Sequence, residues 1–197
     1  MLLNRIILER KIKGTLSKYF RIKFTTKSET AKVRSRVLSY CIGKGCDIGF
    51  GGDKISKVNC VGIDLPQPYT TTGKDGVDIG CDVIREEIPV ADNTFDYVYT
   101  SHLIEDFTDT KDALRKFIRI LKENGTLILV FPDQIKYEFI CKNAGIILNP
   151  YHVHPNMGRD YMIDKLNELT NINYQILYQS NCEIDYNVIL VLKITKK

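Results

Sequence analysis

No stretch of this sequence is apolar for long enough to cross a membrane. The longest apolar runs, "TLILVF" at 126–131 and "VILVL" at 188–192, are far shorter than the ~20 residues that a membrane helix needs. The opening "MLLNRIIL" is interrupted by Asn4 and Arg5, and it is too short for the apolar core of a secretion signal. With 197 residues, of which 44% are hydrophobic, we expect a cytoplasmic protein with one main domain.

The sequence also lacks the paired cysteines and clustered histidines that hold metals. Its six cysteines form no CxxC pair, and several lie within apolar runs, where cysteine packs as a small hydrophobe. Because no secretion signal favours disulfides, we expect reduced thiols. The three histidines are His102, His152 and His154, and their spacing with Cys141 matches no zinc motif. We therefore expect no metal site.

Acidic residues are scarce at the start of the chain. Residues 1–45 hold twelve Lys or Arg against two acids, whereas the remainder is mildly acidic. Apolar residues recur with helical spacing over 3–24, so we predict a basic helical arm at 1–40 and a domain at 41–197. The arm either packs on the domain as a solvated helix or is attracted to the phosphates of lipids or nucleic acids. It shows no aromatic and basic interleaving typical of an RNA-binding module.

From residue 45 onward, short apolar runs end in glycine or aspartate. Runs typical of strands lie at 46–50, 59–64, 76–83, 95–101 and 125–131. The last two flank a helical pattern that Asp109 or Thr110 can cap, and strand, helix and strand in that order predict a parallel crossover.

The rest of the chain predicts one more helix and two closing strands. The helix is expected at 159–170, and strands at 172–179 and 187–194 are close enough in sequence to pair antiparallel. We therefore predict an α/β fold, with a Rossmann-like, mostly parallel seven-stranded sheet, a C-terminal antiparallel hairpin and helices on both faces.

Three successive strand ends carry residues suited to a nucleoside. Gly49, Gly51 and Gly52 follow the first strand, where the absence of a Cβ lets the backbone turn sharply and approach a ligand. Asp64 ends the second strand and can accept hydrogen bonds from a vicinal diol such as a ribose. Asp82 ends the third and can accept from the amine of a base. Because open α/β sheets bind ligands beyond these ends, we expect one pocket there.

This region resembles the class I S-adenosylmethionine-dependent methyltransferases. Their first motif, an acid followed by glycines, is matched by Asp47, Gly49 and Gly51 in "DIGFGG". The stretches "IPVADNTFDYVYTSHLIEDF" and "ALRKFIRILKENGTLILVFPD" look like two further segments of the family. The resemblance covers about residues 45–133 and implies S-adenosylmethionine as the cofactor. The residues that it assigns to the cofactor are Asp47, Gly49, Phe50, Gly51, Asp64, Leu65, Asp82, Val83 and Ser101.

The chain departs from the family pattern in three places. Asp53 stands where the third glycine is usual, Asp106 replaces the histidine of the family's "LEH", and the link between the first two strands is too short for a full helix. A dinucleotide oxidoreductase needs that helix, because its N-terminus meets the pyrophosphate. The short link therefore favours the sulfonium cofactor.

The histidines are the candidate catalytic residues. Methyl transfer to an alcohol calls for a general base, and His102, His152 and His154 lie at or near predicted strand ends. The Asn-Pro-Pro-aromatic motif of enzymes that methylate DNA amines is replaced by "TSHL". We predict O-methylation of a small-molecule or carbohydrate-type acceptor. The alternatives are an RNA methyltransferase that grips phosphates with the arm, and a non-catalytic relative that binds a partner. Contact of the arm with a membrane surface stays open.

Overall fold

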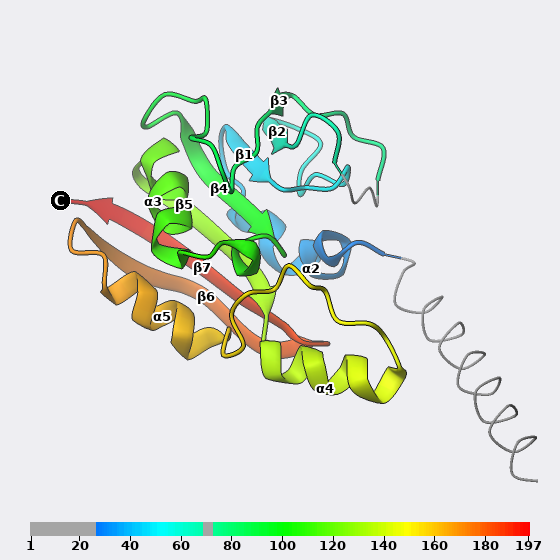
Figure 1. Cartoon of the computed structure of the whole chain (residues 1–197). Helices are drawn as coiled ribbons and strands as arrows, with labels where there is room; N and C mark the ends of the chain where they lie inside the picture. The colour runs from blue at the N-terminus through cyan, green and yellow to red at the C-terminus, as the bar shows by residue number, and fades with distance from the viewer. Residues whose placement is uncertain (1–26, 69–72) are drawn as a thin grey trace, which may run out of the picture.

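The computed structural model describes residues 27–68 and 73–197, so most of the predicted arm lies outside the described residues. The strands form one sheet in the order β3-β2-β1-β4-β5-β7-β6 (Figure 1). The strands are β1 (Gly45–Ile48), β2 (Cys60–Asp64), β3 (Ile79–Gly80), β4 (Phe95–Ser101), β5 (Leu121–Pro132), β6 (Ile172–Ile184) and β7 (Asn187–Lys196). The first five run parallel, and β7 pairs antiparallel with both β5 and β6. The predicted seven-stranded sheet with its closing hairpin is confirmed.

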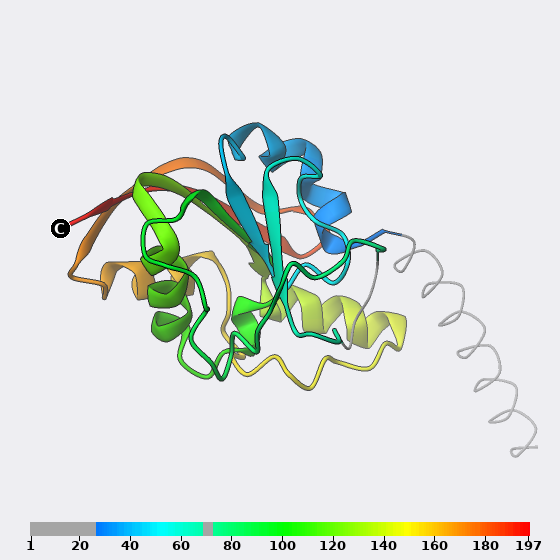
Figure 2. The ribbon, with the colours of Figure 1, turned by 90° about the horizontal axis from the view of Figure 1, so that it is seen from above.

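Helices cover both faces of this sheet (Figure 2). The α-helices are α2 (Glu29–Val37), α3 (Thr110–Ile120), α4 (Gln134–Ala144) and α5 (Arg159–Asn167), and the short 3-10 helices are η1 (Leu38–Tyr40) and η2 (Ile104–Asp106). On one face, Val33 and Val37 of α2 pack on the buried side chains of β4, β5 and β7. On the other face, α3 and α5 bury their apolar sides in the larger core cluster. Within the part of the chain that the structure describes, no helix is long and apolar enough to span a membrane.

The link between β1 and β2 is as compact as the sequence predicts. Residues 49–59 contain turns and no α-helix. The buried carboxylate of Asp47 accepts from the Ile55 N–H at 2.6 Å, and Arg34 of α2 pairs with Asp53 at 2.6 Å. Asp53 therefore ties the link to α2, which accounts for a carboxylate at a position where the family uses glycine.

The sequence pattern ends the helix after Asp109 at Asn124-Gly125; this end, the length of β3 and the presence of α4 all differ in the structure. α3 stops at Ile120 because the chain passes directly into β5, which starts at Leu121. β3 keeps only two paired residues of the predicted 76–83. α4 was not predicted at all: Asp133 caps it by accepting from the Lys136 N–H, and Gly145 ends it in the left-handed region at φ 65°.

Candidate functional site

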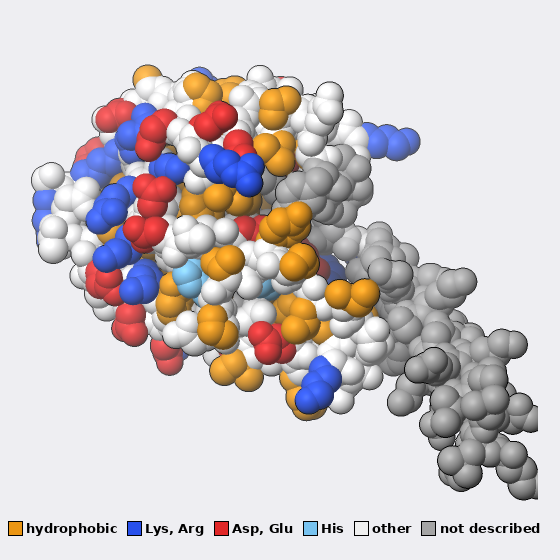
Figure 3. Space-filling view, viewed as in Figure 1, with side chains coloured by type: hydrophobic (Ala, Val, Ile, Leu, Met, Phe, Trp, Pro, Cys, Tyr) orange, Lys and Arg blue, Asp and Glu red, His pale blue; other side chains and the backbone are white. Residues whose placement is uncertain are grey.

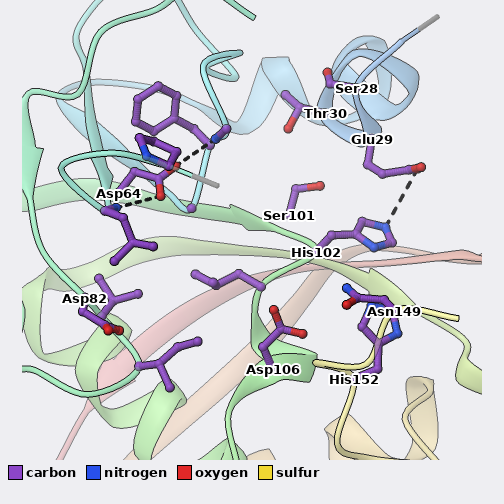
Figure 4. A pocket seen from close by; sticks show the side chains of 18 of the residues that line it. Ser28, Glu29, Thr30, Asp64, Asp82, Ser101, His102, Asp106, Asn149 and His152 are labelled. Atoms are coloured by element: carbon purple, nitrogen blue, oxygen red, sulfur yellow. Dashed lines mark hydrogen bonds and ion pairs between the residues drawn. The ribbon is translucent and has the colours of Figure 1, made fainter. Parts of the chain in front are cut away.

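A cavity of about 300 Å³ opens where the carboxyl ends of the parallel strands meet. Residues that follow β1, β2, β3 and β4 line it, together with the start of α2, part of α4 and the turn before β7. Figure 4 shows Asp64 and Asp82 toward one side of the cavity and Glu29, His102 and His152 toward the other. The site therefore has an acidic strand-end side and an imidazole side.

The glycine turn after β1 forms part of the wall. Gly49 has φ 70°, a conformation that glycine adopts without strain, and a Cβ there would lie 2.9 Å from Cδ2 of Leu103, so a larger residue would displace that side chain. Gly51, at φ 54°, donates its N–H to Oδ2 of Asp64 at 2.9 Å. The turn and the end of β2 are thereby locked together at the cavity edge.

Asp64 is held as a preorganised acceptor. Its Oδ1 accepts from the Leu65 N–H at 2.8 Å, while Oδ2 accepts from Gly51. Burial raises the pKa of this carboxyl, and the two backbone N–H groups oppose that rise. Each oxygen of an ionised carboxylate has about two acceptor sites, so each keeps capacity for a further donor such as a ribose hydroxyl.

Asp82 and Val83 line the same cavity beyond the end of β3. Asp82 pairs with the exposed Arg85, whose Nη1 lies 3.0 Å from its Oδ2. The buried Lys116 of α3 donates to the Val83 carbonyl at 3.3 Å and pairs with Asp112. α3 thus steadies the loop that brings both residues to the cavity.

The structure brings most of the sequence-predicted cofactor residues together. Those that line the cavity are Gly49, Phe50, Gly51, Asp64, Leu65, Asp82, Val83 and Ser101. Asp47 is fully buried and does not line it. Because its carboxylate receives the Ile55 N–H, Asp47 acts on the cavity by shaping the β1–β2 link.

His102 is surrounded by acceptors. It follows β4 with φ 54°, and its Nε2 lies 2.6 Å from Oδ1 of Asn187 and 3.9 Å from Glu29. Its Nδ1 lies 3.2 Å from the buried Glu105. Burial alone would lower the pKa of this imidazole, but Glu105 and Glu29 raise it to about 9. His102 is therefore a cation at neutral pH.

His152 lines the same cavity, but its pKa is shifted in the opposite direction. Gln134 donates to Glu138 at 2.9 Å, which leaves its carbonyl to accept from Nδ1–H of His152 at 2.8 Å. The Nε2 of His152 then carries the lone pair, 3.6 Å from Glu105. Burial and the charge of His102 lower the pKa of His152, against the opposing effect of Glu105. His152 is therefore neutral at neutral pH.

His154 is not brought to the cavity. Its Nε2 lies 2.6 Å from the Phe107 carbonyl and 3.2 Å from Thr110, and its Nδ1 lies 3.1 Å from the hydroxyl of Tyr161. These contacts join the loop before α5 to α3. They account for His154 as a structural residue and give it no contact with a ligand.

Sequence reasoning missed several residues of the imidazole side. Glu105 stands beside Asp106 in "LIEDF", so the motif contains it. No local pattern marks the others, because they come from α2, from α4, from the loop after it and from the hairpin turn. Those that line the cavity are Glu29, Tyr137, Asn149 and Tyr186.

Glu29 is bound at both of its oxygens. Oε1 accepts from Lys32 at 2.8 Å and from Tyr186 at 3.1 Å, and Oε2 accepts from Asn187 at 2.9 Å. Although burial opposes ionisation, the charges of His102 and Lys32 lower the pKa of Glu29. In residues 27–68 and 73–197, no group of three metal-ligating side chains is found.

Comparisons with known proteins agree on one kind of domain. Residues 45–129 match a family described as a methyltransferase domain. An uncharacterized methyltransferase of Bacillus subtilis, YcgJ, is 22% identical over 139 residues, which is 65% of this chain and 54% of YcgJ. The ubiquinone/menaquinone biosynthesis C-methyltransferase UbiE of Cronobacter sakazakii is 33% identical over 73 residues, 37% of this chain and 28% of UbiE. The matched region thus spans about half or less of these curated relatives.

Solved structures show the same fold over nearly the whole chain. The crystal structure of a SAM-dependent methyltransferase from Thermotoga maritima has a TM-score of 0.61 and 19% identity, covering 94% of this chain and 98% of that one. A SAM-dependent methyltransferase from Archaeoglobus fulgidus has a TM-score of 0.60 and 16% identity, covering 89% and 99%.

Proposed function

Because residues 45–129 carry a class I S-adenosylmethionine-dependent methyltransferase domain, we propose that this protein methylates a hydroxyl group of a small polar acceptor such as a saccharide. One observation carries the proposal. A single cavity joins the glycine turn and Asp64 to a neutral imidazole, so a cofactor contact surface and a candidate base share one space.

The residues present fit the cofactor. Gly49 and Gly51 line the cavity without a Cβ, and Asp64 keeps acceptor capacity for a diol. We assign the ribose hydroxyls to Asp64 and the adenine to Asp82 and the N–H of Val83. Phe50 and Leu65 would pack against the apolar parts of the nucleoside, and Ser101 lines the cavity beside His102. When bound, S-adenosylmethionine would supply a methyl group on a positively charged sulfur. The sulfur would leave as a neutral thioether when an acceptor oxygen takes the methyl group.

His152 is the proposed general base. An acceptor hydroxyl must lose its proton as its oxygen is methylated, and a neutral imidazole with a free Nε2 lone pair can take that proton. Gln134 fixes the ring by holding Nδ1–H. Glu105 lies 3.6 Å from Nε2 and would stabilise the imidazolium that forms. His102 is already charged, so it is assigned to hydrogen bonding and to balancing the charge of Glu29 and Glu105.

The imidazole side also supports a polar acceptor. Tyr137, Asn149, Tyr186 and Asp106 line it. Such groups match the many hydroxyls of a sugar better than an apolar ring. A cavity of about 300 Å³ is at the lower end of small-ligand pockets, which suits one group of the acceptor entering beside the cofactor.

Two measurements test the proposal. Titration calorimetry with S-adenosylhomocysteine should show binding, and no heat at millimolar ligand would remove the cofactor assignment. Labelled S-adenosylmethionine should then give methyl ethers with a panel of monosaccharides and small alcohols. Binding without turnover on any acceptor would favour the non-catalytic alternative. Transfer to RNA alone, weakening steeply with salt, would favour the RNA methyltransferase.

A further inference from the structure

One oxygen of a buried carboxylate lies between the two imidazoles of the cavity. Oε1 of Glu105 is 3.2 Å from Nδ1 of His102 and 3.6 Å from Nε2 of His152. The side chain of Glu105 is 1% exposed, and apart from the two rings no donor in the described residues reaches its oxygens. Because a buried charge needs a partner, this carboxylate depends on the two rings.

Backbone contacts fix this arrangement. His102 follows β4, and its N–H donates to the Val130 carbonyl of β5 at 2.9 Å. The carbonyl of Glu105, in η2, accepts from the Val153 N–H at 3.1 Å, which holds the loop of His152 against η2. In Figure 3, histidine side chains show only as small patches at the surface, in agreement with exposed fractions of 16% for His102 and 5% for His152. Because the three side chains are largely removed from water, their charges interact strongly.

The hydrogen bonds place a hydrogen on both nitrogens of His102. The amide nitrogen of Asn187 donates to Glu29 at 2.9 Å, so its amide oxygen faces Nε2 of His102 at 2.6 Å as an acceptor. Nδ1 faces the carboxylate of Glu105, which is also an acceptor. A ring that donates from both nitrogens is a cation, and the raised pKa of His102, about 9, agrees with this.

His152 carries a hydrogen on one nitrogen only. Its Nδ1–H is bound by the Gln134 carbonyl at 2.8 Å. At 3.6 Å, Nε2 is too far from Oε1 of Glu105 for a hydrogen bond, so this contact requires no hydrogen on Nε2. The shared oxygen therefore stabilises the charge of His102, and His152 keeps a lone pair on Nε2.

The other titratable groups near the rings each lie beside one of them. Those near His102 are Glu29 and Lys32 of α2 and Tyr186 of the hairpin turn, and those near His152 are Tyr137 and Glu138 of α4. Asp106, the last residue of η2, lines the same cavity. In the part of the chain that the structure describes, Glu105 is therefore the carboxylate that forms ion-pair contacts with both rings.

We propose that Glu105 is a positioning residue for the methyl transfer: its shared oxygen holds His102 as the cation and thereby leaves His152 as the ring that takes the proton of the acceptor. This rests on the proposed function, in which that proton moves from the acceptor hydroxyl to Nε2 of His152 while the methyl group moves to the acceptor oxygen. Oε1 of Glu105 would then stabilise both imidazolium rings until His152 returns the proton to water.

Proton NMR of the ring hydrogens in the full chain tests this without a methyl donor. The chain has three histidines, so single variants of each assign the signals. In the wild type, His102 should titrate at about pH 9 and His152 below pH 6.5. Glu105→Gln, which keeps the size but not the charge of the side chain, should lower the midpoint of His102 by at least about one pH unit. An unchanged midpoint would overturn the proposal.

Glu138→Gln is the matched control. Glu138 accepts from Gln134 and acts on His152, but it is not among the ion-pair partners of His102 in the described residues. Removing its charge should leave the midpoint of His102 unchanged. An equal drop in both variants would contradict the proposal, because the loss of any negative charge would then be enough.

His102→Asn tests the sharing of Oε1 and does not require Glu105→Gln to fold. Without the first ring, Glu105 serves His152 alone and a positive charge is lost, so the midpoint of His152 should rise by at least about one pH unit. In Glu105→Gln/His102→Asn, compared with Glu105→Gln, the rise should be clearly smaller. No rise in the single variant, or a rise of the same size in both backgrounds, would rule the sharing out.

The pH–rate profile connects the titrations to turnover. In His102→Asn the acid limb should move up by the same amount as the midpoint of His152, because that ring must be neutral to take the proton. A limb that stays in place while the midpoint moves would overturn both the role of Glu105 in turnover and the assignment of His152 as the base. Midpoints that do not move would overturn the Glu105 proposal alone and leave the cofactor and acceptor assignments standing.

Discussion

His102 and His152 lie in one cavity, yet their neighbours give the two rings different charges. Glu105 approaches both, at 3.2 Å from His102 and 3.6 Å from His152, but Glu29 and Asn187 add to the stabilisation of His102 alone. The positive charge of His102 in turn disfavours protonation of His152. Because their pKa values differ, the charged His102 can balance the nearby carboxylates while the neutral His152 can accept a proton.

The neutral ring yields a prediction about turnover. His152→Gln keeps an amide that can bond to Gln134 but removes the proton acceptor, so turnover should fall at least about 100-fold. Affinity for S-adenosylhomocysteine should stay within about twofold in the same calorimetric titration. In the wild type, the acid limb of the pH–rate profile should lie below pH 6.5, because the pKa of His152 is lowered from that value. An unchanged rate in the variant would exclude His152 as the base.

The charged ring yields a prediction about stability. Below pH 6.5 His102 is protonated in both the folded and the unfolded chain, so its contacts stabilise the fold fully; the benefit is lost as the pH rises through about 9. His102→Asn, with a side chain that tolerates positive φ, should cost about 3 kcal/mol at pH 6 and far less at pH 10. Urea unfolding at both pH values measures the difference. A cost that does not change with pH would show that the ring is not held as a cation.

At the scale of elements, the sequence predicted the helices and strand ends that are marked by hydrophobic periodicity and by turn residues. α3 has a clear apolar side and a capping Asp109, and the glycines and acids mark the strand ends that meet at the cavity. α4 escaped prediction because its pattern is inverted: Ile135 and Phe139 face outward while Gln134 is buried. Tertiary contacts to His152 and Tyr186 decide that orientation, and no local pattern carries them.

α2 offers a prediction that links packing to binding. Val33 is fully buried against the sheet, and the first residues of the same helix line the cavity. Val33→Ala should lower the free energy of unfolding by about 2 kcal/mol, from two lost methyl groups and the void they leave. It should also weaken S-adenosylhomocysteine binding measurably. Ser35→Ala, at an exposed position of the same helix, should change neither quantity. Weaker stability with unchanged binding would show that α2 does not support the cavity.

At the scale of the molecule, the order of the strands predicts how protection is distributed. β5 and β7 lie inside the sheet with fully buried stretches, whereas β3 has two residues and lies at the edge. Amide hydrogen exchange should therefore be slowest at 127–131 and 188–192 and fastest, among strands, at Ile79 and Gly80. Adding S-adenosylhomocysteine should slow exchange of the Gly51 N–H. Equal rates in β3 and β7 would contradict the arrangement.

The overall sheet followed from the sequence, but the full set of cavity residues did not. Consecutive strands joined by short links allow few topologies, so the order of elements largely decides the fold. The cavity instead unites Glu29 with Tyr186, which are separated by most of the chain. Only the folded structure shows that α2 and the hairpin turn both reach the cavity.

The inner position of β7 has a consequence for biosynthesis. Tyr186 lines the cavity and Asn187 holds His102, while β7 fills the gap between β5 and β6. A nascent chain whose residues from 186 onward are still inside the ribosome exit tunnel has an unpaired edge on β5 and an open wall at the pocket. Translation that stops short of Asn187 thus leaves a fragment prone to aggregate and unable to build the imidazole side.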